Sequence, residues 1–435
     1  QRTLSRSVFG GDRYVMRKAN SYGLLLLLIF VSFPFPAIAV DVLGVWGGDE
    51  VESFRIMVSP WEKQTGASVD FSGTRDLSAV LTTRVAAGNP PDIAILPNTG
   101  MMVDLAESGK LVPLDSFLNM DRHRQEYSRA WIELGIVGGR LYGLFMKADS
   151  KSTVWYSPAV FSARGWKVPE TWDELIALSD RIREEGMRPW SVAVESGEAS
   201  GWPATDWIGE ILLHESGPEV YDQWVRHDIP WTDGRIRSAW EKFGRIALTP
   251  GYVPGSAAGI LATGFIDGAY LPFTDPPGAV MYFLGAFTQG FIAEQFPDLE
   301  AGRDYAFFPF PAIDPRWRGA VTGGANVVVA FRDDAEVRSL IGYLASTEAQ
   351  RIWVDRGGFT AVNSKVDLDL YPDALARRAA EQLAAAEVFR FDADDSMPPA
   401  VQKAFWEGIL AYLQDPASLD RILDEIEARA AEAYR

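Results

Sequence analysis

The sequence predicts an α/β fold with a mostly parallel, doubly wound sheet, and it predicts two lobes. Segments typical of strands and helices alternate from position 42 to position 109, which is the pattern of parallel sheets. About 400 residues follow the first 39, which is too many for one compact core. The sequence contains no obvious linker and no internal repeat, so we expect a chain that crosses between the lobes more than once.

The first part of the chain supplies the alternation. Strands are expected at 42–46, 67–71 and 92–96, and helices at 51–65, 77–87 and 101–108. The helix at 51–65 has apolar residues at helical spacing, and Gly66 fits its C-cap. A turn at 138–143 (GGRLYG) predicts a hairpin.

The later elements are less regular. Thr171 and Glu174 form a capping-box pattern that predicts a helix over 171–185. The stretch 201–294 is expected to be mostly helical, with Pro and Gly breaks. Further expected elements are strands at 154–156 and 326–331, and helices at 335–355, 372–388, 401–413 and 418–435.

The N-terminal region has the three parts of a secretory signal: basic residues at 16–18, an apolar run at 24–31 and a small-x-small site at 37–39. We expect residues 1–39 to be a signal peptide cleaved after Ala39, with the residues before Met16 an upstream artefact. The apolar run is shorter than the roughly 20 residues that span a bilayer. A membrane anchor is the alternative interpretation.

Composition narrows the function. The formal charge of −18 disfavours nucleic acid and anionic membrane surfaces as partners. The absence of cysteine excludes disulfides and a lipid-bearing cysteine after the signal. With only three histidines as well, we expect no transition-metal site and no cofactor. The sequence thus predicts a soluble periplasmic or secreted protein without membrane insertion, and its 15 Trp residues favour a cleft that stacks flat ligands.

Motifs of enzymes are scarce. The sequence has no G-x-S-x-G elbow, no phosphate-binding glycine-rich loop and no H-E-x-x-H helix. Gly323 and Gly324 are better explained by a tight turn before a strand. We therefore expect a binding protein and no catalytic residues.

The richest cluster is 201–207 (GWPATDW), in which two indoles flank one carboxylate. Sugar rings stack on aromatic faces, and their hydroxyls bond to carboxylates, so Trp202, Asp206 and Trp207 are candidate ligand contacts. The alternative is that Asp206 caps a helix and the Trp residues pack in a core. Glu50, Asp76 and Asn98 also lie just past expected strands, where ligands bind in open α/β sheets.

Short motifs across the chain resemble those of the extracellular solute-binding proteins of sugar ABC transporters, of the maltodextrin and α-glucoside type. They are 46–50 (WGGDE), 89–94 (NPPDIA), 139–143 (GRLYG), 156–161 (YSPAVF) with Gly165 and Trp166, 169–175 (PETWDEL), 281–287 (MYFLGAF), 308–311 (FPFP), 323–326 (GGAN) and 346–350 (STEAQ). Residues 201–207 and 397–406 are most similar to the α-glucoside branch.

The resemblance implies a two-lobed, type II periplasmic-binding fold with the ligand cleft between the lobes and three hinge crossings. The lobes would comprise 40–147 with 322–366, and 150–320 with 370–435. The ligand contacts that it implies are Asp49, Glu50, Asn98, Trp202, Asp206, Trp207, Phe287, Asn326 and Trp406. Phe287 stands where the family usually has Trp. Lys147 or Lys151 is expected to reach either the ligand or a carboxylate between the lobes, and the sequence leaves the choice open.

The function implied is capture of an α-glucoside or a short α-linked oligosaccharide by a monomer that closes its lobes and delivers the sugar to ABC transporter permease subunits. A secreted glycoside hydrolase is the alternative from another class, because it would also be acidic and rich in Trp and carboxylates. A binding protein for another polar ligand, such as a polyol, is the second alternative.

Overall fold

The computed structural model describes residues 39–435, apart from the side chain of Ala130. The described residues form one compact unit. The predicted signal peptide lies outside the described residues, except for Ala39, which begins the first strand. Within the described range, the helices all fall short of the length and apolar character that crossing a membrane requires.

The first lobe is built on the larger sheet, which has seven strands among the described residues, in the order β12-β6-β11-β3-β1-β2 with β13 beside β11. Its strands are β1 (Ala39–Gly44), β2 (Ser68–Gly73), β3 (Ile93–Leu96), β6 (Leu144–Ser150), β11 (Val321–Ala330), β12 (Thr360–Ala361) and β13 (Phe389–Phe391). β1 runs parallel to β2 and β3. The predicted α/β class with parallel strands at 42–96 is therefore confirmed.

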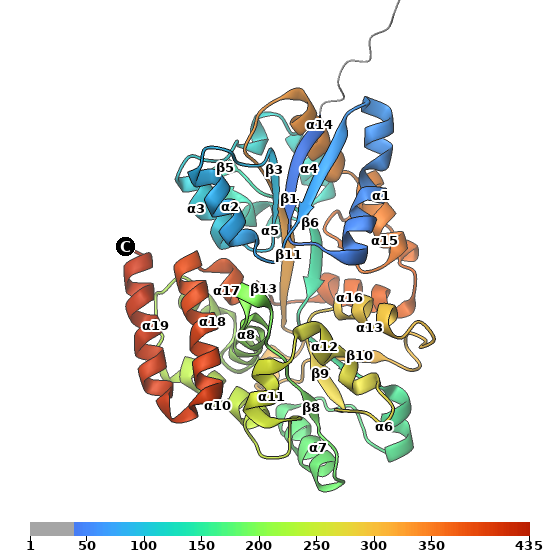
Figure 1. The fold of residues 1–435 in the computed structure, drawn as a ribbon, viewed down its shortest axis with the longest axis vertical. Helices are drawn as coiled ribbons and strands as arrows, with labels where there is room; N and C mark the ends of the chain where they lie inside the picture. The colour runs from blue at the N-terminus through green and yellow to red at the C-terminus, as the bar shows by residue number, and fades with distance from the viewer. Residues whose placement is uncertain (1–38) are drawn as a thin grey trace, which may run out of the picture. The chain divides into compact units, whose positions relative to one another are not determined.

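The expectation of a mostly parallel sheet is wrong, because β11 runs antiparallel to β3 and β6, and β12 runs antiparallel to β6. β6 leads the chain out of the first lobe and β11 leads it back (Figure 1). Two strands that connect the same lobes in opposite senses must pair antiparallel. The sheet is mixed for this reason.

Helices cover both faces of this sheet: α1 (Gly48–Thr65), α2 (Leu77–Ala86), α3 (Thr99–Glu107), α4 (Met120–Glu126), α5 (Arg129–Leu134), α14 (Ala335–Leu344) and α15 (Thr347–Arg356). Gly66 ends α1 in the left-handed conformation at φ 76°, as predicted. The single helix expected at 335–355 is two helices, since the Ser346 side chain accepts the Ala349 amide and starts a new one.

The second lobe contains a smaller sheet in the order β10-β7-β9-β8, formed by β7 (Thr153–Tyr156), β8 (Trp190–Ser191), β9 (Met281–Phe283) and β10 (Ala306–Pro309). Its helices are α6 (Pro158–Arg164), α7 (Trp172–Glu184), α8 (Trp202–Ser216), α9 (Pro218–Val225), α10 (Gly234–Ala247), α11 (Ser256–Ala262), α12 (Phe265–Tyr270), α13 (Thr288–Gln295), α17 (Ala393–Ser396), α18 (Pro399–Gln414) and α19 (Leu419–Ala433). Thr171 caps α7 by accepting the Glu174 amide, as predicted.

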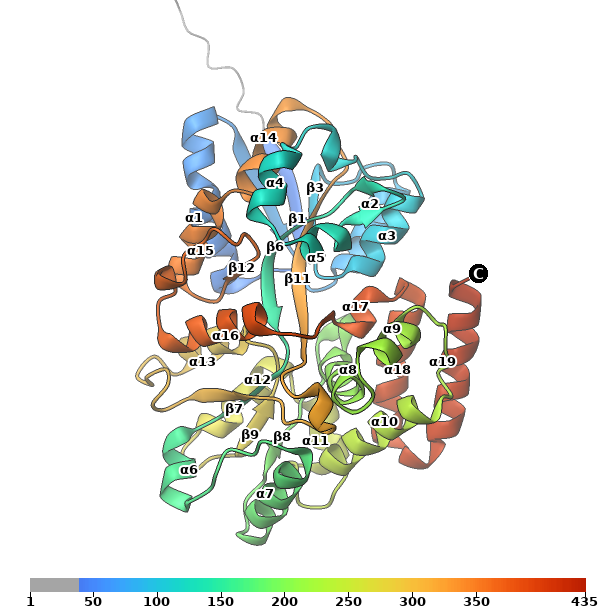
Figure 2. The same cartoon turned by 180° about the vertical axis from the view of Figure 1, so that it is seen from behind.

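The remaining elements are short or lie at the junction. The hairpin expected at 138–143 is present as β4 (Ile136–Val137) and β5 (Arg140–Leu141). α16 (Ala374–Ala385) lies between the two lobes in both views (Figures 1 and 2). The 3₁₀ turns are η1 (Leu114–Ser116), η2 (Gly197–Ala199), η3 (Leu271–Phe273), η4 (Pro315–Trp317), η5 (Leu368–Leu370) and η6 (Pro416–Ser418).

Each lobe has its own hydrophobic core. In the first lobe, Val42, Ile95 and Val328 are fully buried beside the helices of the larger sheet, while Trp207, Trp240 and Phe405 are buried in the second. The chain passes between these cores after β6, before β11 and around α16 (Figure 2). The boundaries 40–147 with 322–366 and 150–320 with 370–435 stay a prediction.

Candidate functional site

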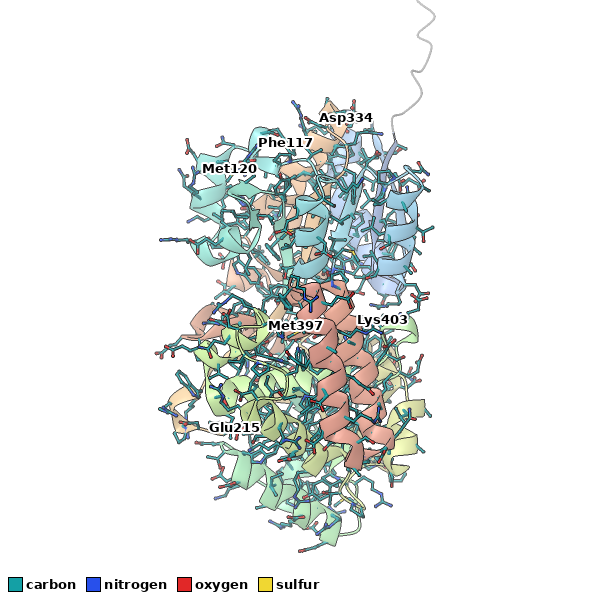
Figure 3. The ribbon with its side chains drawn as sticks, turned by 90° about the vertical axis from the view of Figure 1, so that its left-hand side faces the viewer. Phe117, Met120, Glu215, Asp334, Met397 and Lys403 are labelled. Atoms are coloured by element: carbon teal, nitrogen blue, oxygen red, sulfur yellow. The ribbon has the colours of Figure 1, made fainter. Side chains whose placement is uncertain are left out.

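A cavity of about 1310 Å³ lies between the lobes, with walls from both. The first lobe contributes residues of α1, α2, α3, β6 and β11, and the second contributes residues of η2, α8, α12, α13, α17 and α18. In Figure 3, Met397 and Lys403 lie at this level, between Phe117 and Met120 of the first lobe and Glu215 of the second. Lys403 is one of the lining residues.

The cavity brings together seven of the ten residues that the sequence proposed as ligand contacts. They are Glu50, Asp76, Asn98, Trp202, Phe287, Asn326 and Trp406. These residues come from segments as far apart in the chain as α1 and α18. Asp49, Asp206 and Trp207 are outside this set.

Trp207 belongs to the core of the second lobe, contrary to its expected place in the cleft wall. It is 2% exposed, and its ring packs 4.5 Å from Phe283 and 5.1 Å from Trp190, between centroids. On α8 the side chain five positions after Trp202 points to the opposite face of the helix. The core alternative is the one that the structure shows for this residue.

Asp49 and Asp206 also differ from the expectation. Asp49 is exposed in the first turn of α1, where a carboxylate stabilises the helix N-terminus, while Glu50 beside it reaches the cavity. Asp206 is buried and bonds Lys151 Nζ at 3.0 Å. Asp206 thus holds Lys151, which lines the cavity, without lining the cavity itself.

Lys147 and Asp149 on one face of β6, and Lys151 directly after the strand ends, line the cavity at alternating positions. Side chains two apart in a strand share a face. A bulge in the β6–β11 pairing, where Asn326 faces Lys147 and Val327 faces Phe145, makes Met146 the extra residue just before this face. Sequence reasoning left the roles of the two lysines open and missed Asp149.

Lys147 binds Glu50 and not an interlobe carboxylate. Its Nζ lies 2.7 Å from Glu50 Oε1 and 5.3 Å from the centroid of the Trp353 ring. Burial lowers the pKa of Lys147, but Glu50 and Asp149 outweigh it and hold that pKa above its ordinary value. Arg75 is a second cation beside Glu50, at 3.7 Å.

Asp149 has no hydrogen bond or ion pair to another side chain among residues 39–435. Burial raises the pKa of its carboxyl to about 6, against the attraction of Lys147 and Lys151, and Glu50 raises it further. It is therefore a cavity carboxyl whose oxygens are available to donors of a ligand.

Lys151 is surrounded by acids of the second lobe. Its Nζ contacts Asp206, Asp392 and Asp395, the last at 3.7 Å, and lies 5.3 Å from the centroid of the Trp202 ring. These carboxylates hold its pKa well above the usual value although burial opposes them. Burial raises the pKa of Asp395 to about 7. The acidic segment 392–395 is visible in the sequence, but nothing there indicates its partner 241 residues away.

Aromatic rings make up much of the cavity lining that the second lobe contributes. Trp202 lies 5.1 Å from Phe265 and 6.1 Å from Phe287, and Phe291 lies 5.9 Å from Phe287, between centroids. All four line the cavity. Such rings offer apolar faces to the C–H groups of a sugar.

Trp406 is held by one hydrogen bond from its indole. Trp406 Nε1 donates to Asp394 Oδ2 at 2.6 Å, and Asp394 is 1% exposed. Burial, followed by the charges of Asp392 and Asp395, raises the pKa of Asp394 well above its ordinary value. This bond fixes the orientation of the ring on α18.

The two lobes also touch beside the cavity, at the N-terminus of α3. Asn98 accepts the Met101 amide at 3.0 Å and so caps this helix, as well as lining the cavity. Thr99 Oγ1 donates to the carbonyl oxygen of Asp395 at 3.2 Å. A Cβ on Gly100 would lie 2.0 Å from the Met397 carbonyl oxygen, so only glycine allows this approach.

Comparison with known proteins agrees with this geometry. The profile of the bacterial extracellular solute-binding protein family matches residues 47–351. The osmoprotective compounds-binding protein GgtB of Synechocystis sp. is 38% identical over 389 residues, covering 89% of this chain and 91% of that protein. The α-glucosides-binding periplasmic protein AglE of Rhizobium meliloti is 32% identical over 391 residues, 88% of this chain and 84% of that protein.

Solved structures share the fold at lower identity. The bacterial solute receptor AcbH superposes with a TM-score of 0.78 at 19% identity, covering 91% of this chain and all of that one. A chitin oligosaccharide binding protein superposes with a TM-score of 0.78 at 18% identity, and the match covers 92% of this chain and 99% of that one. The two-lobed fold expected from the resemblance is confirmed, and the chain belongs to the bacterial extracellular solute-binding protein family.

Proposed function

We propose that the protein is the sugar-binding component of an ABC importer and that it captures an α-glucoside or a short α-linked oligosaccharide. The observation that carries this proposal is the cavity itself, which is lined both by aromatic rings of the second lobe and by carboxyls of the first lobe. Family members are binding proteins, and AglE is named for α-glucosides. No bond would be made or broken.

The size of the cavity supports a ligand of more than one ring. Its volume of about 1310 Å³ exceeds the roughly 300–1,000 Å³ of ordinary small-molecule sites. Trp202 and Phe287 line it on α8 and before α13, while Trp406 lines it on α18. Rings at separate places on the wall offer stacking surfaces for successive sugar units.

The proposed cycle is capture and delivery. Lobe closure about the crossings of β6 and β11 would surround the sugar, and the closed monomer would dock on permease subunits outside the cytoplasm. Micromolar affinity corresponds to about −8 kcal/mol. A few stacked rings and several hydrogen bonds to ionised groups suffice for that after the ordering cost.

A thermal-shift panel on the chain without its signal tests the ligand class. Maltose and cellobiose are a matched pair, because they differ only in the configuration of one linkage. We expect maltose to raise the unfolding midpoint more than cellobiose, since a ligand at 100 times its dissociation constant adds about 2.7 kcal/mol. A larger shift with cellobiose would contradict the α-linkage, and no shift with any sugar would contradict the sugar assignment.

A different small polar solute is the second candidate, because GgtB is named for osmoprotective compounds and is 38% identical to this chain. Sorbitol and glycerol therefore belong in the same panel, and a shift with a polyol alone would favour this candidate. The hydrolase alternative predicts steady release of glucose from maltose, which a coupled glucose assay would detect.

A further inference from the structure

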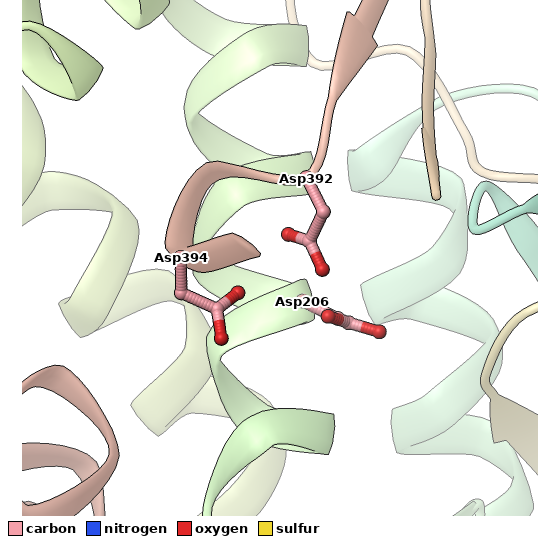
Figure 4. A group of neighbouring side chains, drawn as sticks. All are labelled: Asp206, Asp392 and Asp394. Carbon is pink, nitrogen blue, oxygen red and sulfur yellow. The ribbon is translucent and has the colours of Figure 1, made fainter. Parts of the chain in front are cut away.

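Three buried carboxyls converge at the cavity wall, where Asp394 is itself a lining residue. Asp206 lies on α8, Asp392 precedes α17 and Asp394 lies within it (Figure 4). One oxygen from each lies within 4.8 Å of the others. The three residues are 2%, 2% and 1% exposed.

The charges of this group are only partly balanced. With Asp395 nearby, four acids gather around Lys151, which is the one cation that the ion pairs within residues 39–435 place among them. Carboxylates without compensation are costly to bury, because removing each ion from water takes several kcal/mol. The remaining negative charge must therefore be neutralised, either by protons on some of the carboxyls or by a bound cation.

The orphaned oxygens show where that charge would act. Lys151 contacts Oδ1 of Asp206 and Oδ2 of Asp392, and the Trp406 indole donates to Oδ2 of Asp394. Asp206 Oδ2 and Asp394 Oδ1 are buried without a hydrogen-bond partner among the described residues. Unpartnered buried polar atoms point to something that binds them.

We propose that Asp206, Asp392 and Asp394 form a site for one hard divalent cation of the Ca²⁺ type. Ca²⁺ takes carboxylate oxygens at about 2.3–2.6 Å, so ligands on opposite sides of the ion lie about 4.6–5.2 Å apart, which fits the spacing found here. Lys151 keeps its own contacts, because it uses other oxygens of Asp206 and Asp392. The donors are all oxygen, which is the ligand type that Ca²⁺ prefers and that transition metals favour less.

The cation would connect two parts of the cleft wall. Asp206 is four residues after Trp202 on α8, and Asp394 holds the Trp406 indole. Joining α8 to α17 through a metal would fix both indoles relative to one another. Asp206 and Asp392 lie outside the cavity lining and Asp394 belongs to it, so the ion would sit at the edge of the wall beside Trp406.

Calcium binding without any sugar is the direct test. The mature chain, freed of metals by dialysis against a chelator, is titrated with CaCl₂ in a calorimeter to about 10 mM, above the roughly 0.1–1 mM constants of extracellular Ca²⁺ modules. We expect one ion per chain and a midpoint of thermal unfolding that rises with CaCl₂ and not with NaCl of equal ionic strength. No heat and no shift over this range would overturn the proposal.

Two substitutions locate the ion. Asp394→Asn should abolish the Ca²⁺-dependent shift, whereas Asp70→Asn, the same change at an exposed position on β2 of the first lobe, should leave it unchanged. Undiminished binding by Asp394→Asn would place the ion elsewhere and overturn the site. If Asp394→Asn does not fold, Asp206→Asn serves the same purpose.

Terbium luminescence gives an independent readout that needs no sugar. Tb³⁺ replaces Ca²⁺ at oxygen sites and is sensitised by nearby indoles, here those of Trp406 and Trp202. We expect emission on Trp excitation that CaCl₂ competes away and that Trp406→Phe diminishes. Absence of sensitised emission in the native chain would contradict a cation among these carboxyls and favour their neutralisation by protons.

Discussion

Asp149 carries a sharp residue-scale prediction because its carboxyl faces the cavity without a protein partner. If a sugar hydroxyl donates a hydrogen bond to this carboxyl, the bond is strongest when the carboxyl is ionised, because both oxygens then act as charged acceptors. With a pKa of about 6, ionisation grows between pH 5 and pH 7, so sugar affinity should rise over this range. Asp149→Asn should weaken binding about tenfold or more and remove that pH dependence, as calorimetry at several pH values would show.

The same substitution has a predicted effect on stability. The pKa of Asp149 is raised above 3.8 by burial, so the folded state holds a proton that the unfolded state has already lost between pH 4 and pH 6. Stability contributed by this group therefore falls as the pH rises through that window. Asp149→Asn should accordingly raise the unfolding midpoint of the sugar-free protein at pH 7 more than at pH 4. A lower midpoint at pH 7 would contradict the assignment.

Two tryptophans that the sequence proposed as ligand contacts should respond differently to truncation. Trp406→Ala should leave the fold intact and weaken sugar binding by about 2 kcal/mol, roughly 30-fold. Trp207→Ala should instead cost about 3–5 kcal/mol of stability, because its ring is enclosed by Phe283 and Trp190. Circular dichroism melts measure the stability of each variant, and calorimetry measures its sugar affinity. A Trp207→Ala variant that keeps its stability and loses affinity would indicate that Trp207 belongs to the binding site.

For single residues, the sequence predicted the location correctly where that type of side chain had one plausible location. Glu50, Trp202 and Trp406 were proposed from composition, position and resemblance, and the structure places them in one cavity. Trp207 was misplaced because an indole serves a core and a sugar site equally well. Asp392 and its neighbours were missed because their partner Lys151 is distant in the chain.

Among the elements, α3 depends on one position where a side chain cannot be accommodated. Gly100→Ala would place a methyl group 2.0 Å from the Met397 carbonyl, so α3 and α17 must separate beside the cavity. We expect weaker sugar binding and a lower unfolding midpoint, measured by calorimetry and thermal scans.

Gly342→Ala is the matched control, because Gly342 lies inside α14 with open space around its Cα. There the change should stabilise the protein by up to about 1 kcal/mol without altering affinity. If the two variants had equal unfolding midpoints and equal sugar affinities, the close contact between α3 and α17 would not depend on glycine at position 100.

The elements were largely predictable, and their pairing was not. Helix caps such as Thr171 and Gly66 act locally, so the sequence identifies them directly. The antiparallel course of β11 against β3 and β6 depends on where the chain returns from the second lobe. This return is determined by pairing between residues more than 170 positions apart in the chain. Local sequence periodicity contains no information about such distant pairs.

Considered as a whole, the molecule is expected to change shape on binding, since both lobes contribute to one cavity. Small-angle X-ray scattering should show a smaller radius of gyration when the sugar that gives the largest thermal shift is added. A sugar that gives no thermal shift, at equal concentration, is the control. A radius of gyration that is unchanged at a saturating sugar concentration would contradict lobe closure and indicate a rigid cleft.

The register of β6 has a consequence for how such a protein can diversify. Its cavity face carries Lys147 and Asp149, with Lys151 following at the next alternate position just after the strand. Its other face carries Ala148 in the core and Ser150 bonded to Gln382 of α16. Inserting or deleting one residue would exchange these faces, burying charge in the core and emptying the cavity of it. Evolution can therefore change what this strand recognises by substituting single residues, whereas the length of the strand is fixed by its double duty as recognition surface and interlobe connection.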